Sequence, residues 1–338
     1  MDFRRTFRTA RVDTGTGAAG PASRRTALRR IGLAAGGAAL AAGAGAGTAR
    51  AAERRGAGPR TYVLVHGTHS SGAFWMPIAR ELTLRGHRVV TVDQPMHGAE
   101  AFVPVAYQTQ DLAALATEPS PLRDLTLDDY EKRVTDTVRR AARHGGPVVL
   151  VGHSLGGASV SRVADAVPGL LAHICYMAAF CPSPAMPSPD ACTAAPENAD
   201  ALIPYEQMVG DQEKLRVLRL NPRSGAVKDL AAYKAMMCAD YPDPAFRLAL
   251  SGLQTDEPIG AYAGQAVGRP DTWGRLPRTY LRFGKDRTIA TRLQDRMIAE
   301  ADERTPDNPF RVVDFPDAPH IGPLDPAAVT DALARLGR

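Results

Sequence analysis

The chain has 338 residues, of which 44% are hydrophobic and 23% are charged, and its formal net charge is +5. Nine arginines and only two acidic residues fall within residues 1–51, so residues 52–338 carry a net charge of −2. The composition is sufficient for a sizeable hydrophobic core, and the nearly neutral remainder argues against a nucleic-acid partner.

Residues 1–51 have the pattern of an export signal. Arg24 and Arg25 precede a weakly hydrophobic run of Ala, Gly, Leu and Ile over 31–47, and the small residues "ARA" follow at 49–51. We therefore predict a twin-arginine signal peptide, secretion through the export machinery that reads it, and a mature chain of residues 52–338. The run is too short and too rich in Ala and Gly to predict stable membrane insertion, and a disordered Ala/Gly tail is the alternative.

After residue 60, short apolar runs alternate with helical patterns. The apolar runs predict strands at 61–67, 87–95, 147–152, 173–180, 278–284 and 310–315. Spacing and capping residues predict helices at 74–86, 126–146, 156–167 and 325–337. Because the strands are almost wholly apolar, they predict an α/β fold with a doubly wound, mostly parallel sheet that is covered by helices on both faces.

Residues 182–277 interrupt this alternation. They contain many prolines, no strong strand pattern, and helical patterns over 205–220 and 229–241. We interpret them as a helical cap inserted between two strands of the sheet. The loop at 99–120 is long, and two roles remain open for it: lining a pocket or covering an edge of the sheet.

The stretch "VVLVGHSLGGASV" carries the clearest chemical motif. Residues 152–156, "GHSLG", fit G-x-S-x-G between a predicted strand and a predicted helix. So tight a turn requires small residues at Gly152 and Gly156, and it exposes the hydroxyl of Ser154 at the carboxyl end of the strand. The N–H of Leu155, at the start of the helix, can stabilise a developing oxyanion. We predict that Ser154 is a nucleophile, the alternative being an ordinary serine in a Gly-rich turn.

A serine nucleophile needs a histidine base, and only two histidines follow Ser154. His173 opens a predicted strand and therefore lies at the amino-terminal edge of a parallel sheet, on the wrong side. His320, in "FPDAPHIGPLDP", follows the last predicted strand and lies at the carboxyl edge. We predict His320 as the base, with a surface-loop histidine as the alternative.

The histidine in turn needs an acid that orients it. Asp286 follows the predicted strand 278–284, whereas Asp314 and Asp317 share the terminal segment of His320. We predict Asp286 as the acid. Its alternative role is the N-cap of the following helix.

The loop "HGTHSSGAFW" follows the first predicted strand. Gly67 permits a close backbone approach, and the N–H of Thr68 is the predicted second oxyanion donor. His66 and His69 form an H-x-x-H pair without an evident third ligand, so we predict no metal. His66 is instead predicted to pack or hydrogen-bond beneath the loop, and His153 to be a packing residue.

The four cysteines show no metal-binding or C-x-x-C spacing. Cys175 lies in an apolar run and is predicted in the core. Export would permit a disulfide between Cys192 and Cys238, which the sequence alone does not establish.

These pieces together resemble the α/β-hydrolase superfamily, and within it the group of plant methyl-ester esterases and hydroxynitrile lyases. The resemblance rests on "LVHGTHSSGAFW", "RGHRVVTVDQPMHG", "LVGHSLGG", "ICYMAAFCPSP", "MMCADYPDPAFRLALSGL" and "DAPHIGPLDP". It implies a Ser154–His320–Asp286 triad, oxyanion donors at Thr68 and Leu155, no cofactor, and ester substrates under a helical cap. The lyases of this group carry a lysine directly after the histidine, where this chain has Ile321, so a lyase is not expected.

The sequence therefore predicts a secreted serine hydrolase that cleaves a small-molecule carboxylic ester. Ser154 would attack the carbonyl carbon, His320 would transfer the proton, and Asp286 would orient His320. Hydrolysis of an amide or lactone is one alternative. A small-molecule-binding protein on the same fold is the other, since fold alone does not fix function.

Overall fold

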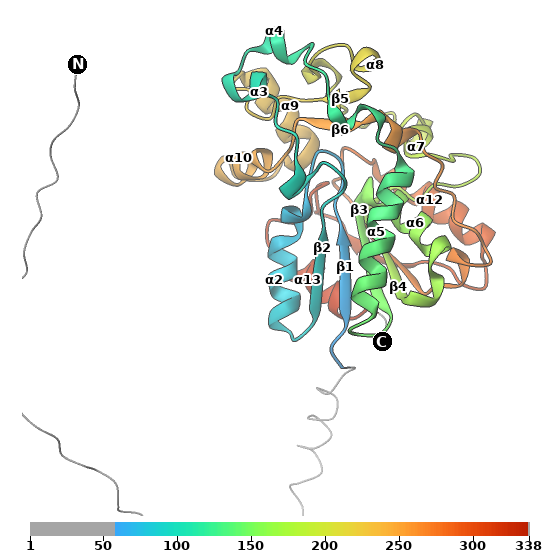
Figure 1. Ribbon diagram of the computed structural model, residues 1–338. Helices are drawn as coiled ribbons and strands as arrows, with labels where there is room; N and C mark the ends of the chain where they lie inside the picture. Colours follow the sequence, from blue (N-terminus) through green and yellow to red (C-terminus); the bar gives the residue numbers. More distant parts are fainter. Residues whose placement is uncertain (1–57, 337–338) are drawn as a thin grey trace, which may run out of the picture. The chain divides into compact units, whose positions relative to one another are not determined.

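The computed structural model describes residues 58–336, so the signal peptide predicted over 1–51 lies outside the described part of the chain. A six-stranded sheet with strand order β2-β1-β3-β4-β7-β8 forms the centre, and all its pairings are parallel (Figure 1). Its strands are β1 Thr61–Val65, β2 Arg88–Val92, β3 Val148–Ser154, β4 Leu171–Ala179, β7 Arg278–Phe283 and β8 Arg311–Phe315. The six strands predicted from apolar runs are these six, and the predicted doubly wound α/β fold is confirmed.

Helices cover both faces of the sheet. Figure 1 shows α2 (Met76–Leu84) and α13 (Ala327–Ala334) side by side on one face. The other face is covered by α5 (Leu127–Ala142), α6 (Gly156–Ala166) and α12 (Thr291–Arg304). All four helices predicted around the sheet are present.

The two hydrophobic cores follow from alternation along each strand. In β1, Val63 and Val65 pack with the α5, α6 and α12 side, whereas Tyr62 and Leu64 pack with the α2 and α13 side. All four side chains are fully buried. Successive side chains of a buried parallel strand face opposite sides of the sheet, and both sides are covered. Every position is therefore apolar, and the strands read as continuous apolar runs.

The segment 182–277, which we call the cap segment, lies over the carboxyl ends of the strands (Figure 1). Its helices are α7 Pro189–Thr193, α8 Gln212–Leu215, α9 Val227–Cys238, α10 Asp243–Ser251 and α11 Ile259–Ala263. It also contains an antiparallel pair of strands, β5 Val217–Arg219 and β6 Asp256–Pro258.

Two expectations about the cap segment were wrong. The predicted helical pattern over 205–220 holds a three-residue 3-10 helix and one α-helix, α8, of four residues. Arg216 adopts a left-handed conformation with φ +59° and ends α8. The chain then enters β5, although no strand was expected in this segment. Strands of three residues are too short to leave a periodic pattern in the sequence.

The loop at 99–120 carries two short helices, α3 Val105–Thr109 and α4 Leu112–Leu115. A buried ion pair of the cap segment, Arg219 and Asp256, is hydrogen-bonded to this loop through the arginine. The Arg219 guanidinium binds both carboxylate oxygens of Asp256 at 2.7 Å, and it donates to the carbonyl oxygens of Leu115 and Glu118 at 2.6 and 2.7 Å. Because one guanidinium binds β6 of the cap segment and the 99–120 loop at once, the loop is held as part of the cap structure.

Short 3-10 helices occupy several of the connections. They are Gly72–Trp75, Gly98–Glu100, Pro121–Asp124, Pro168–Leu170, Pro196–Asn198, Tyr205–Gln207 and Trp273–Arg275. Within residues 58–336, no helix is both long enough and apolar enough to cross a membrane.

All four cysteines are buried and unpaired. Cys175 lies in the core, as predicted. The bridge that the sequence permits between Cys192 and Cys238 is not formed, because the two residues belong to different hydrophobic clusters. Cys192 packs with the core of the sheet, whereas Cys238 packs inside the cap segment with Tyr233 and Phe246.

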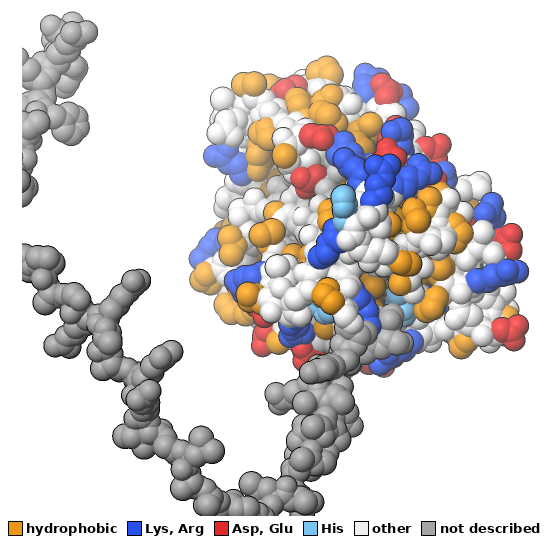
Figure 2. Space-filling view, turned by 60° about the horizontal axis from the view of Figure 1, so that its bottom comes forward, with side chains coloured by type: hydrophobic (Ala, Val, Ile, Leu, Met, Phe, Trp, Pro, Cys, Tyr) orange, Lys and Arg blue, Asp and Glu red, His pale blue; other side chains and the backbone are white. Residues whose placement is uncertain are grey.

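On the face shown in Figure 2, basic, acidic and hydrophobic side chains are interspersed, with one small group of Lys and Arg side chains. This mixed surface agrees with the nearly neutral net charge of residues 52–338.

Candidate active site

Ser154 lies on a strained turn where β3 ends and α6 begins. Its φ is +53°, a left-handed conformation that residues other than Gly and Asn seldom adopt. A Cβ added to Gly152 would lie 2.5 Å from the carbonyl oxygen of Gly156. One added to Gly156 would lie 2.7 Å from the carbonyl oxygen of His66. The turn therefore requires glycine at both predicted positions, and the surrounding backbone holds the strain.

The structure brings Ser154, His320 and Asp286 together. His320 Nε2 lies 3.1 Å from Ser154 Oγ, and His320 Nδ1 lies 2.8 Å from Asp286 Oδ2. His320 follows β8 and Asp286 follows β7, so all three residues lie at the carboxyl edge of the parallel sheet. All three are at least nine-tenths buried.

The hydrogen bonds also define what each atom of this group can do. A carboxylate only accepts, so the Nδ1 of His320 carries the proton that faces Asp286. In a neutral imidazole the Nε2 is then an acceptor, and it faces the hydroxyl of Ser154. This arrangement can remove the proton from the serine hydroxyl.

Asp286 is held by its second oxygen. Its Oδ1 accepts the N–H groups of Thr288 and Ile289 at 2.8 and 2.9 Å. The helix α12 begins only at Thr291 and its N-cap is Ala290, so Asp286 is not the N-cap that was its alternative role. It closes the turn before that helix and leaves Oδ2 for His320.

The other candidates lie elsewhere. Asp314 and Asp317 are 61% and 84% exposed and form ion pairs with Arg282 and Lys285. His173 lies near the start of β4, where its Nε2 is 2.9 Å from the hydroxyl of Thr279. None of these three side chains belongs to the group around Ser154.

The loop after β1 lies directly against Ser154. A Cβ added to Gly67 would lie 2.6 Å from the Cβ of Ser154, so only glycine fits there. This contact brings the residue that precedes Thr68 against the nucleophile. Leu155, which follows Ser154, is the N-cap of α6. The two predicted oxyanion donors therefore come from segments that flank the serine on either side.

Two buried histidines, His66 and His153, hold the backbone around Ser154 and His320. His66 Nε2 accepts the N–H of Gln94 at 3.1 Å, so its Nδ1 carries the proton and donates to the carbonyl oxygen of Gly67 at 2.7 Å. Burial, together with the neighbouring His97, lowers the pKa of His66 to about 4. His66 is therefore a neutral hydrogen-bonding residue beneath the loop, as predicted.

His153 stacks on Phe74, with ring centroids 4.5 Å apart, and its Nε2 donates to the carbonyl oxygen of His320 at 2.9 Å. Burial lowers its pKa well below the ordinary value. It is thus a neutral packing residue that also fixes the backbone of His320. Among residues 58–336, no three His, Cys, Asp or Glu side chains are placed to share a metal ion.

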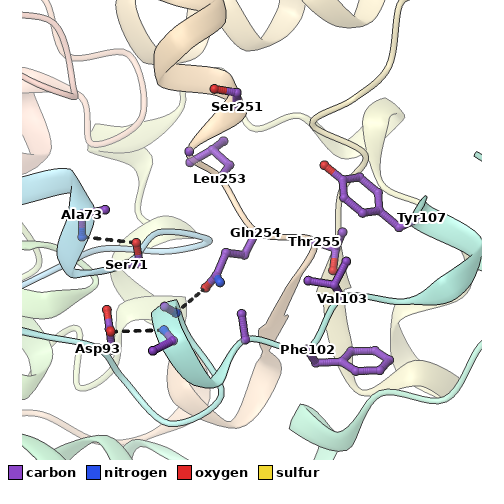
Figure 3. A pocket seen from close by; sticks show the side chains of 14 residues that line it. Ser71, Ala73, Asp93, Phe102, Val103, Tyr107, Ser251, Leu253, Gln254 and Thr255 are labelled. Carbon is purple, nitrogen blue, oxygen red and sulfur yellow. Dashed lines mark hydrogen bonds between the residues drawn. The ribbon is translucent and has the colours of Figure 1, made fainter. Parts of the chain in front are cut away.

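A cavity of about 540 Å³ adjoins the loop after β1 (Figure 3). Phe102, Val103 and Tyr107 of the 99–120 loop form one wall, and Leu253 of the cap segment forms another. Its floor reaches Ser71, three residues beyond Thr68. Of the two roles left open for the loop, lining a cavity is the one that the structure shows.

One charged residue beside this site was not predicted from the sequence. Glu257, in β6 of the cap segment, is buried, and its Oε2 accepts the N–H of His69 at 2.7 Å. It belongs to no motif. The only available signal was the adjacent acidic pair Asp256 and Glu257 in an otherwise uncharged stretch, "SGLQTDEPIGAY".

Comparisons with known proteins agree with the fold. Residues 62–332 match the model of the Alpha/beta hydrolase family. Methylesterase 7 from Arabidopsis thaliana is 24% identical over 263 residues, which cover 78% of this chain and 90% of that protein. A pyrethroid hydrolase from Sphingobium wenxiniae is 25% identical over 246 residues, which cover 70% of this chain and 75% of that protein.

Among solved structures, an extracellular alpha/beta-hydrolase from a Paenibacillus species superposes with a TM-score of 0.61 at 19% identity. The superposition covers 83% of this chain and all of the other. That protein is described as sharing structural and functional homology with tobacco salicylic acid binding protein 2.

Proposed function

This chain belongs to the alpha/beta hydrolase family, and we propose that it hydrolyses carboxylic esters with Ser154 as the nucleophile. The observation that carries the proposal is the buried hydrogen-bonded series from Ser154 Oγ to His320 Nε2 at 3.1 Å and from His320 Nδ1 to Asp286 at 2.8 Å. The names of the relatives, methylesterase and pyrethroid hydrolase, support an ester as the substrate class.

The first half of the reaction forms an acyl-enzyme. Ser154 Oγ attacks the carbonyl carbon of the ester while His320 Nε2 takes the hydroxyl proton. The carbonyl oxygen becomes an oxyanion, which the N–H groups of Leu155 and Thr68 stabilise. The tetrahedral intermediate collapses, and the alcohol leaves with the proton from His320.

The second half releases the acid. Water attacks the acyl-serine carbonyl and gives a proton to His320. The second tetrahedral intermediate then collapses, the bond between its carbon and Ser154 Oγ breaks, and His320 returns the proton to Oγ as the acid leaves. Asp286 remains ionised throughout, because it stabilises the imidazolium form of His320 at both steps.

The residue after His320 favours a hydrolase over a lyase. Ile321 packs against the apolar cluster of α9 and α10 in the cap segment, and its N–H donates to the carbonyl oxygen of Met237. An aliphatic side chain at this position offers no positive charge to a departing anion.

The decisive measurement is steady-state hydrolysis of p-nitrophenyl esters, from acetate to decanoate, by residues 52–338 and by the Ser154→Ala variant. We expect many turnovers from the wild type and none from the variant, and the preferred chain length will indicate the size of the pocket. If both proteins fold but neither turns over, the ester-hydrolase proposal is wrong, and a binding function on this fold takes its place.

We also propose that the protein is exported through the twin-arginine route. Arg24 and Arg25 before a weakly hydrophobic run, with "ARA" at 49–51, support this. Replacing both arginines by lysine should retain the protein inside cells that otherwise export it. Export of the variant at the wild-type level would contradict this proposal.

A further inference from the structure

His69 is held in a strained conformation beside the proposed oxyanion donor. Its φ is +55°, in the left-handed region, and its side chain is buried. Two residues of the cap segment bind its backbone on both sides. Glu257 Oε2 accepts its N–H at 2.7 Å, and its carbonyl oxygen accepts the N–H of Gln254 at 2.6 Å. Such a conformation persists only where the surroundings impose it.

Gln254 is itself fixed. Its Oε1 accepts the N–H of Gly98 at 3.3 Å, and its side chain stands between the loop after β1 and the 98–103 segment (Figure 3). The hydrogen bonds that hold His69 therefore belong to a network that joins the cap segment to the body of the protein.

The next peptide toward Ser154 is held as well. The carbonyl oxygen of Gly67 accepts from His66 Nδ1 at 2.7 Å. Because a trans peptide points its N–H opposite to its C=O, this bond directs the N–H of Thr68 away from His66. With His69 fixed on the far side, Thr68 lies between two restrained peptide groups.

Glu257 is surrounded by donors. Its Oε1 accepts from the hydroxyl of Tyr130 at 2.7 Å, and its Oε2 accepts from His69 N and from His97 Nε2, the latter at 3.3 Å. His97 Nδ1 faces the carbonyl oxygen of Pro95 at 3.0 Å. Both ring nitrogens of His97 therefore face acceptors, so His97 is an imidazolium paired with the carboxylate of Glu257.

The electrostatics agree with this assignment. Burial by itself would raise the pKa of Glu257, but the charge and hydrogen bond of His97 and the N–H of His69 lower it to about 2. Burial would also lower the pKa of His97, and the carboxylate of Glu257 raises it instead. The other groups that act on this histidine are Asp93, His66 and His69.

We propose that Glu257 is a positioning residue for ester hydrolysis: through the N–H of His69 it holds Thr68 in the orientation that directs its N–H at the oxyanion. This inference rests on the function proposed above. It gives the cap segment a part in rate as well as in substrate choice, because a small misplacement of an oxyanion donor costs transition-state stabilisation.

The test compares two substitutions at the same carboxylate. Glu257→Gln keeps the shape, but its amide offers one acceptor oxygen for the three groups that donate to the carboxylate, and it carries no charge opposite His97. Tyr130→Phe removes one hydrogen bond to the same carboxylate, keeps the packed ring, and leaves the contact with His69 intact. The second variant therefore weakens the binding of the same carboxylate but leaves its charge opposite His97 and its link to the loop in place.

We expect Glu257→Gln to lower kcat for p-nitrophenyl acetate about 10- to 100-fold with KM within about threefold, because the lost interaction acts in the transition state. Its affinity for a trifluoromethyl ketone, which forms a tetrahedral oxyanion on the serine, should fall by a similar factor. Amide hydrogen exchange over residues 66–72 should be faster. Tyr130→Phe should stay within about threefold of the wild type in all three measurements.

Equal effects of the two variants, or a Glu257→Gln effect confined to KM, would overturn the inference. Should Glu257→Gln fail to fold, Glu257→Asp keeps the charge beside His97 but shortens the reach to His69, and the same loss of kcat is expected. If the wild type hydrolyses no ester, the proposed function fails, but the exchange comparison still decides whether Glu257 holds the loop. Unchanged exchange over 66–72 in a folded Glu257 variant would refute it.

Discussion

Two buried carboxylate–histidine pairs lie within residues 58–336, and their histidines differ in the group that the second ring nitrogen contacts. In the Asp286–His320 pair, Nδ1 faces the carboxylate and Nε2 faces the hydroxyl of Ser154. In the Glu257–His97 pair, Nε2 faces the carboxylate and Nδ1 faces the carbonyl oxygen of Pro95.

The group that faces the second ring nitrogen therefore decides the role of each histidine. A hydroxyl can give up its proton, so His320 can alternate between its neutral and charged forms. A carbonyl oxygen can only accept, so His97 keeps both protons and cannot act as a base. One pair is suited to proton transfer, and the other is suited to holding a fixed structure.

The largest effect is expected from His320→Gln, which tests whether the Asp286–His320 pair serves proton transfer. We expect kcat for p-nitrophenyl acetate to fall at least about 10,000-fold, because the general base is lost. The free energy of unfolding should change by less than about 2 kcal/mol, because Asp286 keeps the N–H groups of Thr288 and Ile289. Turnover assays and urea denaturation measure the two effects. A variant that retained a tenth of the wild-type activity would show that His320 is not the base.

His97→Gln should have the opposite pattern, a large loss of stability with a small loss of activity. It leaves the Glu257 carboxylate buried without its cation, which costs about 3–5 kcal/mol of folding stability. At a temperature where the variant is folded, kcat should stay within about tenfold of the wild type. Urea denaturation and steady-state kinetics check this. A fully stable variant would mean that His97 is not charged in the folded protein.

The pH dependence of stability separates neutral from charged histidines. Burial lowers the pKa of His66 and of His173 to about 4. Between pH 6.5 and pH 4 the unfolded chain therefore binds more protons at these sites, and the free energy of unfolding falls as the pH is lowered. His97 acts in the opposite sense: its pKa is raised, so its contribution is complete below pH 6.5 and is lost as the pH rises through the raised value.

We expect His173→Asn to lose less stability than the wild type between pH 7 and pH 4, by up to about 3 kcal/mol. His173 lies at the far edge of the sheet from Ser154, so the substitution should leave ester hydrolysis at pH 7.5 unchanged. Urea denaturation at half-unit steps of pH gives the slopes. Parallel curves for the two proteins would show that His173 is not a buried neutral group.

The smallest effect is expected from Tyr262→Phe. The hydroxyl of Tyr262 lies 2.5 Å from Thr68 Oγ1 and is a side-chain contact to the loop that Glu257 holds through the backbone. Because both neighbouring peptide groups remain held, kcat should fall only about two- to fivefold. A loss above 50-fold, with KM unchanged, would assign the orientation of Thr68 to Tyr262 and not to Glu257.

The sequence predicted the sheet and the Ser154, His320 and Asp286 group because both leave local signals. Buried strands read as continuous apolar runs, and a parallel sheet brings the residues after its strands to one edge. The glycines of "GHSLG" add a steric requirement that few other turns impose. Chain order left two histidines, and the edge of the sheet at which each one lies reduced the choice to His320.

The cap segment could not be predicted in the same way. Its strands β5 and β6 are three residues long, and Glu257 makes its contacts with residues 127 to 188 positions away. Such contacts depend on the finished fold and leave no periodic pattern. The absence of a Cys192–Cys238 bridge could not be predicted for the same reason. Only the packing of the finished fold shows that the two thiols belong to different clusters.

The binding of the His69 backbone by Glu257 and Gln254 has a consequence for engineering. Exchanging caps between relatives is an obvious route to new substrate ranges, and it treats the cap as a separable module. Here the strand that contains Glu257, together with Gln254 just before it, would have to stay with the recipient scaffold, so the natural crossover points lie outside residues 254–257. A library that randomises only the helices α9 and α10 would keep this junction intact while changing what the enzyme admits.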